Sequence, residues 1–327
     1  MWQADRLEIT VLVENWVDML LPELDTPGGH CVSRFGLVEH FDPRLIPPAA
    51  ENGLSLLVTA YSGRRATRVL FDAGLTGTVL AHNLRSLDID PTEFDHLVVS
   101  HGHPDHFGGV YGLLDALEAP LPVITHPDAF LPRYAVMGDG RAAPQYNQAF
   151  REDDLDRSGG RQVLTRDPMV LGWGVFTTGE IPRTNDFEGP PQTMDTHAAG
   201  LWQVDGEGRR VPDQVWDEQG LVIDVKGEGL VVLTGCAHAG VVNTIARARE
   251  IAGGEKPIRA VMGGFHLGFP TTPAENVQKT VDAFAELDVA MAVPMHCSGL
   301  PAHAALSTQL ADRYVQPAVG TTFRFGG

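Results

Sequence analysis

The feature that most constrains this chain is the string Ser100-His101-Gly102-His103-Pro104-Asp105-His106, which directly follows an apolar run. That run, at residues 96–100, has the composition of a buried strand. α/β folds usually carry their chemistry where such strands end. The string offers three imidazoles and one carboxylate, which are ligands of divalent ions such as zinc, manganese and iron. It therefore predicts an α/β fold with a metal site at the end of this strand.

The spacing within the string indicates how the ligands are shared. His101 and His103 are two residues apart, so in an extended segment their side chains point the same way and can grip one ion. Asp105 and His106 can then turn toward a second ion. A surface cluster of histidines is the alternative, but the preceding strand and the interleaved glycine and proline argue against it.

The rest of the chain alternates strands with helices. Strands are predicted at 7–13, 54–60, 67–71, 96–100, 121–125, 174–178, 220–225, 229–234, 260–263 and 289–293, and helices at 75–86, 107–117, 240–252, 274–287 and 302–312. The two halves, about 1–170 and 171–327, look like similar modules of strands and helices. No linker separates them, so we expect a single domain spanning residues 1–327.

Three segments lack clear periodicity. Residues 21–50 are rich in proline, glycine and histidine and are expected to form a loop over the active face. Residues 126–170 indicate an insertion or cap with one or two short helices. Residues 183–216 are expected to form a long irregular loop. Structureless loops of that length are usually functional or mobile, so we place this loop at the active face. Trp202 and Trp216 in this loop either line a substrate entrance or pack the loop down.

Composition bounds the possible partners. The chain has 43% hydrophobic residues, as an ordinary folded protein does, and a formal net charge of −18 at pH 7. This charge argues against a broad nucleic-acid surface or an anionic-membrane surface. It is compatible with an anionic small-molecule substrate, because bound cations reverse the local field.

Compartment and covalent cross-links are indicated by further features of the sequence. Three cysteines without paired spacing do not indicate a disulfide framework. Residues 1–6 lack a basic region followed by an apolar core, so no signal peptide is indicated. No apolar run approaches the length of a membrane span. A reducing cytoplasm is the expected location, and the oligomeric state is left open.

The string at 101–106 and its flanks resemble the signature of the metallo-β-lactamase superfamily. Residues 69–74 look like the strand-ending Asp-x-Gly of that superfamily, and residues 107–110 look like the glycine-rich helix start after its metal loop. Further strings are similar to the branch named after 7,8-dihydropterin-6-yl-methyl-4-(β-D-ribofuranosyl)aminobenzene 5′-phosphate synthase. They are Glu51-Asn52-Gly53-Leu54-Ser55, Gly179-Glu180-Ile181-Pro182-Arg183, Thr234-Gly235-Cys236-Ala237-His238-Ala239-Gly240, Gly263-Gly264-Phe265-His266-Leu267 and His296-Cys297-Ser298-Gly299.

The resemblance implies a four-layer αββα sandwich with a two-metal centre at its edge. In that centre His101 and His103 would bind the first ion, and Asp105 and His106 the second. His296 follows an apolar strand at 291–295 and matches the last metal histidine of the superfamily.

Two positions depart from the superfamily pattern. Glu180 stands where a histidine usually follows the middle strand, so its carboxylate either replaces the imidazole as a ligand or does not reach the metal. Cys236 stands where a bridging aspartate is usual. Its thiolate would favour zinc or iron over manganese, and the alternative is a small buried core residue. His238, two residues on, is either a ligand or a group that contacts substrate.

Two more side chains are assigned supporting roles. His266 also follows a strand, and we expect it to contact substrate or to hold a ligand in place, because the ligand set is already full. Asp72 is expected to orient a ligand histidine rather than to bind an ion itself.

The favoured function is a di-metal hydrolase. Two divalent ions, zinc before manganese or iron, would lower the pKa of a water, and the resulting metal-bound hydroxide would attack an ester, lactone, thioester or phosphodiester. Asp105 can also shuttle the proton.

Three rival functions stay open on the sequence. The branch name implies a synthase that joins an aromatic amine to a phosphorylated dihydropterin, for which Arg34, Arg133 and Arg183 are candidate phosphate ligands. The same fold carries di-iron centres in some oxidoreductases. A non-catalytic sensor of a small molecule is the third rival, and the nearly complete ligand set argues against it.

Overall fold

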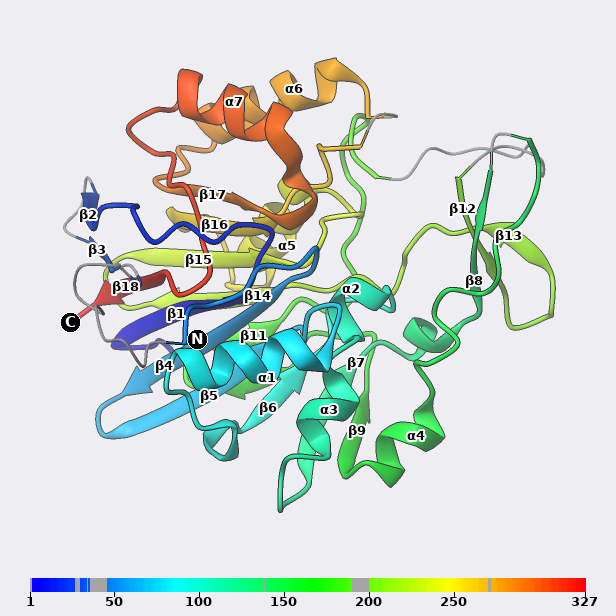
Figure 1. The fold of residues 1–327 in the computed structure, drawn as a ribbon. Coiled ribbons are helices and arrows are strands. Elements are labelled where there is room, and N and C mark those ends of the chain that lie inside the picture. The colour runs from blue at the N-terminus through cyan, green and yellow to red at the C-terminus, as the bar shows by residue number, and fades with distance from the viewer. Residues whose placement is uncertain are drawn as a thin grey trace.

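The computed structural model describes residues 2–26, 30–33, 35, 46–137, 139–189, 200–269 and 272–327. Two large β-sheets pack face to face, and helices cover the outer face of each sheet (Figure 1). The layers therefore follow the order helix, sheet, sheet, helix. This arrangement confirms the predicted αββα sandwich.

The first sheet has nine strands in the order β2-β3-β18-β1-β4-β5-β6-β7-β9. Their bounds are β1 (Arg6–Val13), β2 (Leu24–Thr26), β3 (His30–Ser33), β4 (Ser55–Ser62), β5 (Arg65–Phe71), β6 (His96–Val98), β7 (Leu121–Thr125), β9 (Gly160–Leu164) and β18 (Thr322–Gly326). Strands β4 and β5, predicted at 54–60 and 67–71, pair antiparallel as a hairpin. From β5 to β9 the strands run parallel, so their carboxyl ends meet at one edge of the sheet.

The second sheet has six strands in the order β10-β11-β14-β15-β16-β17. Their bounds are β10 (Val170–Gly172), β11 (Val175–Thr177), β14 (Leu221–Val225), β15 (Gly229–Thr234), β16 (Ile258–Gly264) and β17 (Ala292–Met295). Every residue of β14 is buried, because the first sheet covers one face of this strand and helices cover the other. Strands β15, β16 and β17 run parallel and end at the same edge.

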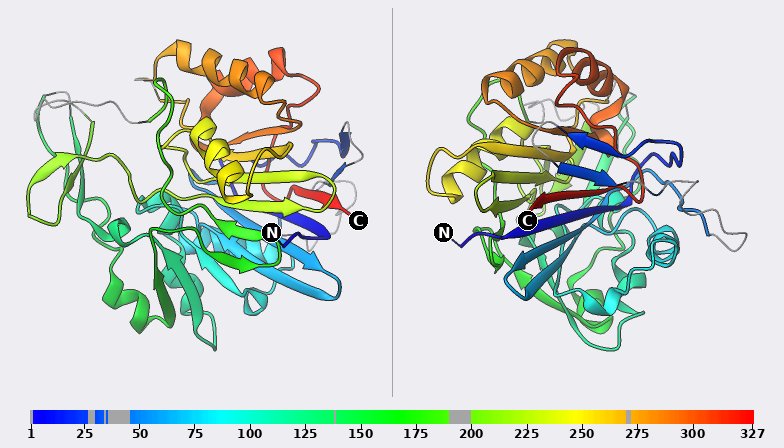
Figure 2. Two further views of the ribbon diagram at one scale, coloured as in Figure 1. Left: turned by 180° about the vertical axis from the view of Figure 1, so that it is seen from behind. Right: turned by 90° about the vertical axis from the view of Figure 1, so that its left-hand side faces the viewer.

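The helices fall into two groups, one on each outer face (Figure 2). On the first sheet lie α1 (Gly77–Ser86) and α3 (Val110–Leu114), and on the second lie α5 (Val241–Ile251), α6 (Ala274–Glu286) and α7 (Gly299–Gln309). The remaining helices are short: η1 (Pro91–Glu93), α2 (Pro104–Phe107), η2 (Pro127–Phe130), α4 (Glu152–Arg157) and η3 (His296–Ser298). Separate apolar cores fill the space between the sheets and beneath each helix group.

The last strand of the chain is absent from the sequence prediction. β18 pairs with β1 in the first sheet, although most of the second half of the chain builds the second sheet. Phe323 and Phe325 of β18 are buried in the core between the sheets. The strand is short and bounded by glycines, so its role depends on this partner rather than on a periodic pattern of its own.

The segment at 126–170 has the short helices η2 and α4 that were predicted for it, and one strand of it joins two strands of the 183–216 segment in a third sheet. Its order is β13-β12-β8, formed by β8 (Arg133–Val136), β12 (Gly200–Val204) and β13 (Arg210–Pro212) (Figure 1). The expectation of an irregular 183–216 segment is therefore wrong where β12 and β13 lie. Pairing with β8 satisfies the backbone of β12, and the sequence of neither segment reveals that partner.

The two tryptophans of this segment have different environments. Trp202 on β12 is 1% exposed and packs the third sheet. Trp216 is 45% exposed, and the Arg183 guanidinium lies 4.0 Å from the centre of its ring. Neither tryptophan is among the described residues that line the cavity beside His103 and Asp105, whereas Leu201, next to Trp202, is.

Among the described helices, none combines the length and the hydropathy of a membrane span.

Candidate metal centre

The candidate metal ligands meet where strands of both sheets end. The loop at 100–106 follows β6 of the first sheet, and the loops at 235–240 and 296–298 follow β15 and β17 of the second. Within the described residues, four groups of side chains have ligand atoms within 4.8 Å of one another. The groups are His101, His103 and His238; His101, His106 and Cys236; Cys236, His296 and Cys297; and Asp105, His106 and His296. The structure thus brings together every side chain that the sequence assigned to the metals except Glu180.

The loop after β6 is anchored by a buried carboxylate. Asp72 accepts hydrogen bonds from the Ser100 backbone N–H at 2.6 Å and the Ser100 hydroxyl at 2.8 Å. Its Oδ2 also lies 2.7 Å from Nδ1 of His106. This contact orients the His106 ring and leaves Nε2 directed toward Cys236 Sγ, 3.1 Å away. The geometry is that of a carboxylate that fixes the orientation of a metal-binding histidine.

Gly102, between the first two histidines, lies against a buried ion-pair network. A Cβ at this position would lie 2.0 Å from the carbonyl oxygen of Ala129, so only glycine fits. The Gly102 N–H donates to Asp217 Oδ2 at 2.7 Å, and Asp217 in turn pairs with the buried guanidinium of Arg133. Arg133 also pairs with Asp213 at 2.7 Å. The network links the third sheet to the metal loop.

Asp105 and the histidines around it shift one another's pKa values. Although burial raises its pKa, the nearby imidazoles of His106 and His296 outweigh burial and hold the pKa well below its usual range. Burial alone would lower the pKa of His106, but the carboxylates of Asp72 and Asp105 raise it to about 9. A bound cation would take the place of the His106 proton, since metal binding and protonation compete for the same nitrogen.

His238 completes the all-nitrogen group with His101 and His103. Burial and the neighbouring imidazoles lower the pKa of His101 and of His238, so both rings are neutral and able to bind a cation. Nε2 of His238 is buried and has no hydrogen-bond partner among the described residues. A buried nitrogen of this kind requires a partner, which a metal ion can supply. Glu218 holds the loop by accepting from the backbone N–H groups of His238, at 2.7 Å, and Ala239, at 2.6 Å.

His296 is held by residues at the other end of the sequence. Its backbone adopts φ of 50°, which is unfavourable for a residue with a side chain. Both oxygens of buried Glu14 accept from its N–H, at 3.1 and 3.0 Å, and Asn15 donates to its carbonyl at 3.0 Å. Nε2 of His296 lies 3.1 Å from Asp105 Oδ2 without the alignment of a hydrogen bond, and Nδ1 has no partner among the described residues. The ring is therefore available to a cation.

Cys236 belongs to two of the four groups: one with His101 and His106, and one with His296 and Cys297. It is 3% exposed, and burial raises the pKa of its thiol well above the usual range, with a further contribution from Cys297. A nearby cation is needed to stabilise the thiolate here, and a bound metal provides one.

Glu180 lies apart from these groups, which agrees with the second of its two alternatives, that its carboxylate does not reach the metal. Its carboxylate pairs with Arg166 at 2.7 Å and with His126 Nε2 at 2.9 Å. His238, from the loop after β15, is the imidazole that lies close to His101 and His103, as the first of its two predicted roles requires. The sequence left that choice open, because the two loops are far apart along the chain.

The metal groups open into a cavity of about 490 Å³. His266 lies in its wall, and the ring centres of His266 and His238 are 4.2 Å apart. Burial lowers the pKa of His266 to about 4, so the ring is neutral. The described residues that line this cavity are Asn52, His103, Pro104, Asp105, Tyr146, Leu201, Cys236, His238, His266, Gly268, Phe269, His296, Cys297 and Gly299.

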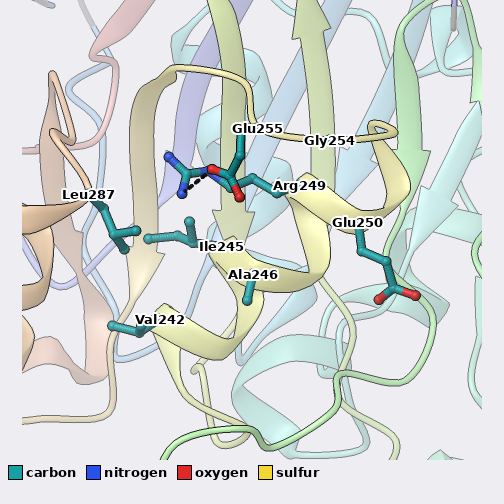
Figure 3. A pocket seen from close by; sticks show the side chains of 8 residues that line it. All are labelled: Val242, Ile245, Ala246, Arg249, Glu250, Gly254, Glu255 and Leu287. Atoms are coloured by element: carbon teal, nitrogen blue, oxygen red, sulfur yellow. Dashed lines mark ion pairs between the residues drawn. The ribbon is translucent and has the colours of Figure 1, made fainter.

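A second cavity, of about 370 Å³, lies on α5 away from this site (Figure 3). Its lining is mainly apolar, with an ion pair between Arg249 and Glu255 at 2.8 Å. It contains none of the histidines or cysteines of the metal groups. Of these two cavities, only the first is lined by members of the metal groups.

Comparison with known families agrees with the fold and with the chemistry of the cluster. Residues 50–296 match the family described as the metallo-β-lactamase superfamily. The chain belongs to this superfamily. The match begins just before the Glu51 string and ends at His296, so it includes every member of the four metal groups except Cys297.

Relatives of this metallo-β-lactamase superfamily member have two kinds of name. It is 32% identical over 293 residues to the 7,8-dihydropterin-6-methyl-4-(β-D-ribofuranosyl)-aminobenzene-5′-phosphate synthase of Methanocaldococcus jannaschii, covering 89% of this chain and 96% of that protein. It is 30% identical to the uncharacterized protein MJ0448 of the same organism, over 79% and 88% of the two chains. The solved structure of Tm1679, a metal-dependent hydrolase of the β-lactamase superfamily, is 27% identical, with a TM-score of 0.68 and coverage of 98% and 100%. The resemblance to the synthase branch is confirmed.

Several residues important to the site were not found from the sequence. Glu14 and Glu218 accept hydrogen bonds from backbone N–H groups of the loops that carry candidate ligands. Asp213 and Asp217 neutralise the buried charge of Arg133. Each of these carboxylates lies close to the end of a strand in the sequence. A single acidic residue near a strand end is too common, however, to indicate a role in a site. The sequence gives Cys297 no predicted role of its own beyond its place in the string at 296–299.

Proposed function

We propose that this protein is a hydrolase that uses two divalent ions, zinc foremost, to cleave an ester, lactone or thioester, with phosphodiesters as a further class. The observation that carries the proposal is the continuous cluster of imidazole, carboxylate and thiol groups that opens into one cavity. When bound, the ions would supply Lewis acidity and a nucleophile derived from water.

Asp105 has the properties of the central catalytic carboxylate. Its side chain is 27% exposed, faces the cavity, and lies 3.1 Å from His296 and 3.9 Å from His106. Because its pKa is held low, Oδ1 and Oδ2 are both unprotonated and can bind a cation or accept a proton from an attacking water. A carboxylate can pass such a proton to the leaving group.

Two neutral side chains are positioned to bind the substrate. Burial raises the pKa of Tyr146, so its phenol stays protonated and can donate to an oxygen that gains negative charge. The Tyr146 hydroxyl lies 3.4 Å from Nε2 of His103, at the edge of the metal groups. His266 can donate or accept a hydrogen bond with its neutral ring. Leu201 and Phe269 add apolar surface to the cavity wall.

The cavity lining is compatible with a carbonyl substrate, which needs no cationic side chain. None of the described residues that line it is a lysine or an arginine. A phosphate monoester usually binds to such side chains or to metal ions. An ester or lactone needs only the metals and neutral hydrogen-bond donors.

The alternative function is the synthase reaction, and the relative with 32% identity supports it. That reaction requires recognition of a phosphorylated substrate. Arg133 does not serve this purpose, because it is fully buried between Asp213 and Asp217. Arg183 contacts Gln214 and Trp216 and does not line the described cavity, and Arg34 lies outside the described residues.

Elemental analysis followed by two activity assays tests the proposal. We expect about two transition-metal ions per chain and hydrolysis of at least one compound in a panel of esters, lactones, thioesters and phosphodiesters. The second assay measures condensation of an aromatic amine with a phosphorylated dihydropterin. Condensation without hydrolysis would establish the alternative function. A metal content below about one quarter of the expected two ions, after addition of zinc, manganese or iron, would contradict both the hydrolase and the synthase function.

A further inference from the structure

Two cysteine sulfurs and one imidazole meet in the wall of the cavity. Cys236 follows β15 and Cys297 lies in η3 after β17, and both line the cavity. The sulfur atoms and a ring nitrogen of His296 lie within 4.8 Å of one another. Cys297 Sγ donates a weak hydrogen bond to the Cys236 carbonyl at 3.4 Å.

The sheet explains why these sulfurs can meet. β16 lies between β15 and β17, so the ends of the two outer strands are roughly 10 Å apart in a regular sheet. β16 ends in Gly264, which has no side chain at this point. A Cβ there would lie 2.6 Å from Cys297 Sγ and 3.0 Å from the Cα of Cys236. Gly264 thus leaves the space through which Cys297 reaches its neighbour.

The three side chains are suited to a soft cation. Two thiolates and one imidazole form one of the common zinc ligand sets, Cys₂His. His296 is 4% exposed, and Nδ1 of its ring has no partner among the described residues. No lysine or arginine lines this cavity within the described part of the chain, so a metal ion is the group that can offset two thiolates.

We propose that Cys297 is a second thiolate ligand of the metal centre, and that Cys236, Cys297 and His296 together bind a thiophilic divalent ion such as zinc or cadmium. The proposal rests on the metal dependence of the proposed function and adds a ligand to it. It makes the two metal positions chemically unequal, because the group of His101, His103 and His238 contains nitrogen only.

Cobalt substitution counts the thiolates directly. In protein loaded with Co²⁺, each sulfur ligand contributes to a charge-transfer band in the near ultraviolet. We expect Cys297→Ser to lower this band by about half, and the double change of Cys236 and Cys297 to serine to abolish it, because a neutral hydroxyl is a poor ligand. Cys31→Ser is the matched control, since β3 lies near the far edge of the other sheet, and it should leave the band unchanged.

A second measurement needs no variant. In zinc-loaded protein, alkylation by iodoacetamide followed by peptide mass spectrometry should spare Cys297, which is partly exposed, and chelation of the zinc should allow its alkylation. A Cys297→Ser protein that keeps the full band, or a Cys297 that is alkylated equally with and without zinc, would overturn the proposal. Cobalt bound without any sulfur band would also overturn it but would leave the hydrolase proposal intact, whereas absence of bound metal would defeat both.

Discussion

The two halves of the metal centre are built in different ways. In the loop after β6, four candidate ligands come from one string, and Asp72 orients a ligand ring directly through His106 Nδ1. In the loops after β15 and β17, the ligands come from separate strands, and the carboxylates of Glu218 and Glu14 hold backbone N–H groups instead. In the first half a carboxylate fixes the orientation of a histidine ring, and in the second half carboxylates fix the backbone conformation of the ligand loops.

The difference indicates where each half is vulnerable. A carboxylate that orients a ring affects the affinity for metal more than folding. A buried carboxylate that satisfies backbone donors affects folding first, since its loss leaves those donors without partners. Substitutions in the two halves should therefore alter different measurements.

The largest expected effect comes from Asp105→Asn. The amide keeps the size of the side chain but loses the negative charge and the capacity to accept a proton, so turnover should fall by roughly 10²- to 10⁴-fold. Turnover of the best substrate and thermal melting are the measurements, and melting should change little. Asp115→Asn, at an exposed position after α3, is the matched control. A variant that keeps most of its turnover would remove Asp105 from the chemistry.

The next effect concerns the thiol shared between the halves. If Cys236 binds metal, Cys236→Ser should weaken metal binding by more than the roughly 10- to 100-fold that loss of a ligand's supporting partner costs. Cys236→Asp should restore much of the binding, because carboxylate and thiolate are both anionic and both bridge cations. Metal content and thermal melting separate the readings. If the Cys236→Ser variant kept all its metal and the Cys236→Asp variant unfolded, Cys236 would be a core residue only.

A pair of substitutions tests the comparison itself. Asp72→Asn should lower metal affinity by about 10- to 100-fold through the orientation of His106. Glu218→Gln should instead lower the free energy of unfolding by about 1–3 kcal/mol, because an amide offers one oxygen to two backbone donors. Metal titration and denaturant unfolding of both variants give the answer. If both variants changed the same quantity to the same extent, the distinction between the halves would be wrong.

The smallest effect is expected at Glu180, which lies outside the metal groups. Glu180→Gln removes a partly exposed ion pair with Arg166, so stability should change by about 0–1 kcal/mol and metal content should stay the same. Thermal melting and elemental analysis provide the test. A loss of one metal ion would restore Glu180 as a ligand and contradict the assignment of His238 to that position.

Local patterns predicted much of this protein. The run before Ser100 and the string up to His106 are contiguous, so their chemistry and their place at a strand end can be read directly. The apolar runs that became β4, β5, β14 and β15 also followed from their periodicity. The resemblance at these strings implied the αββα sandwich, and the structure has that architecture.

Contacts between distant segments were decided only by the tertiary structure. Glu14 and His296 are 282 residues apart in sequence but share hydrogen bonds, and β8 pairs with β12, which belongs to a different predicted segment. Glu180 is diverted to Arg166, while Gly264 leaves room for two cysteines to meet. A sequence pattern records what each residue prefers among its near neighbours. Which buried carboxylate meets which backbone N–H depends on how the two sheets pack, and that is determined by the whole chain at once.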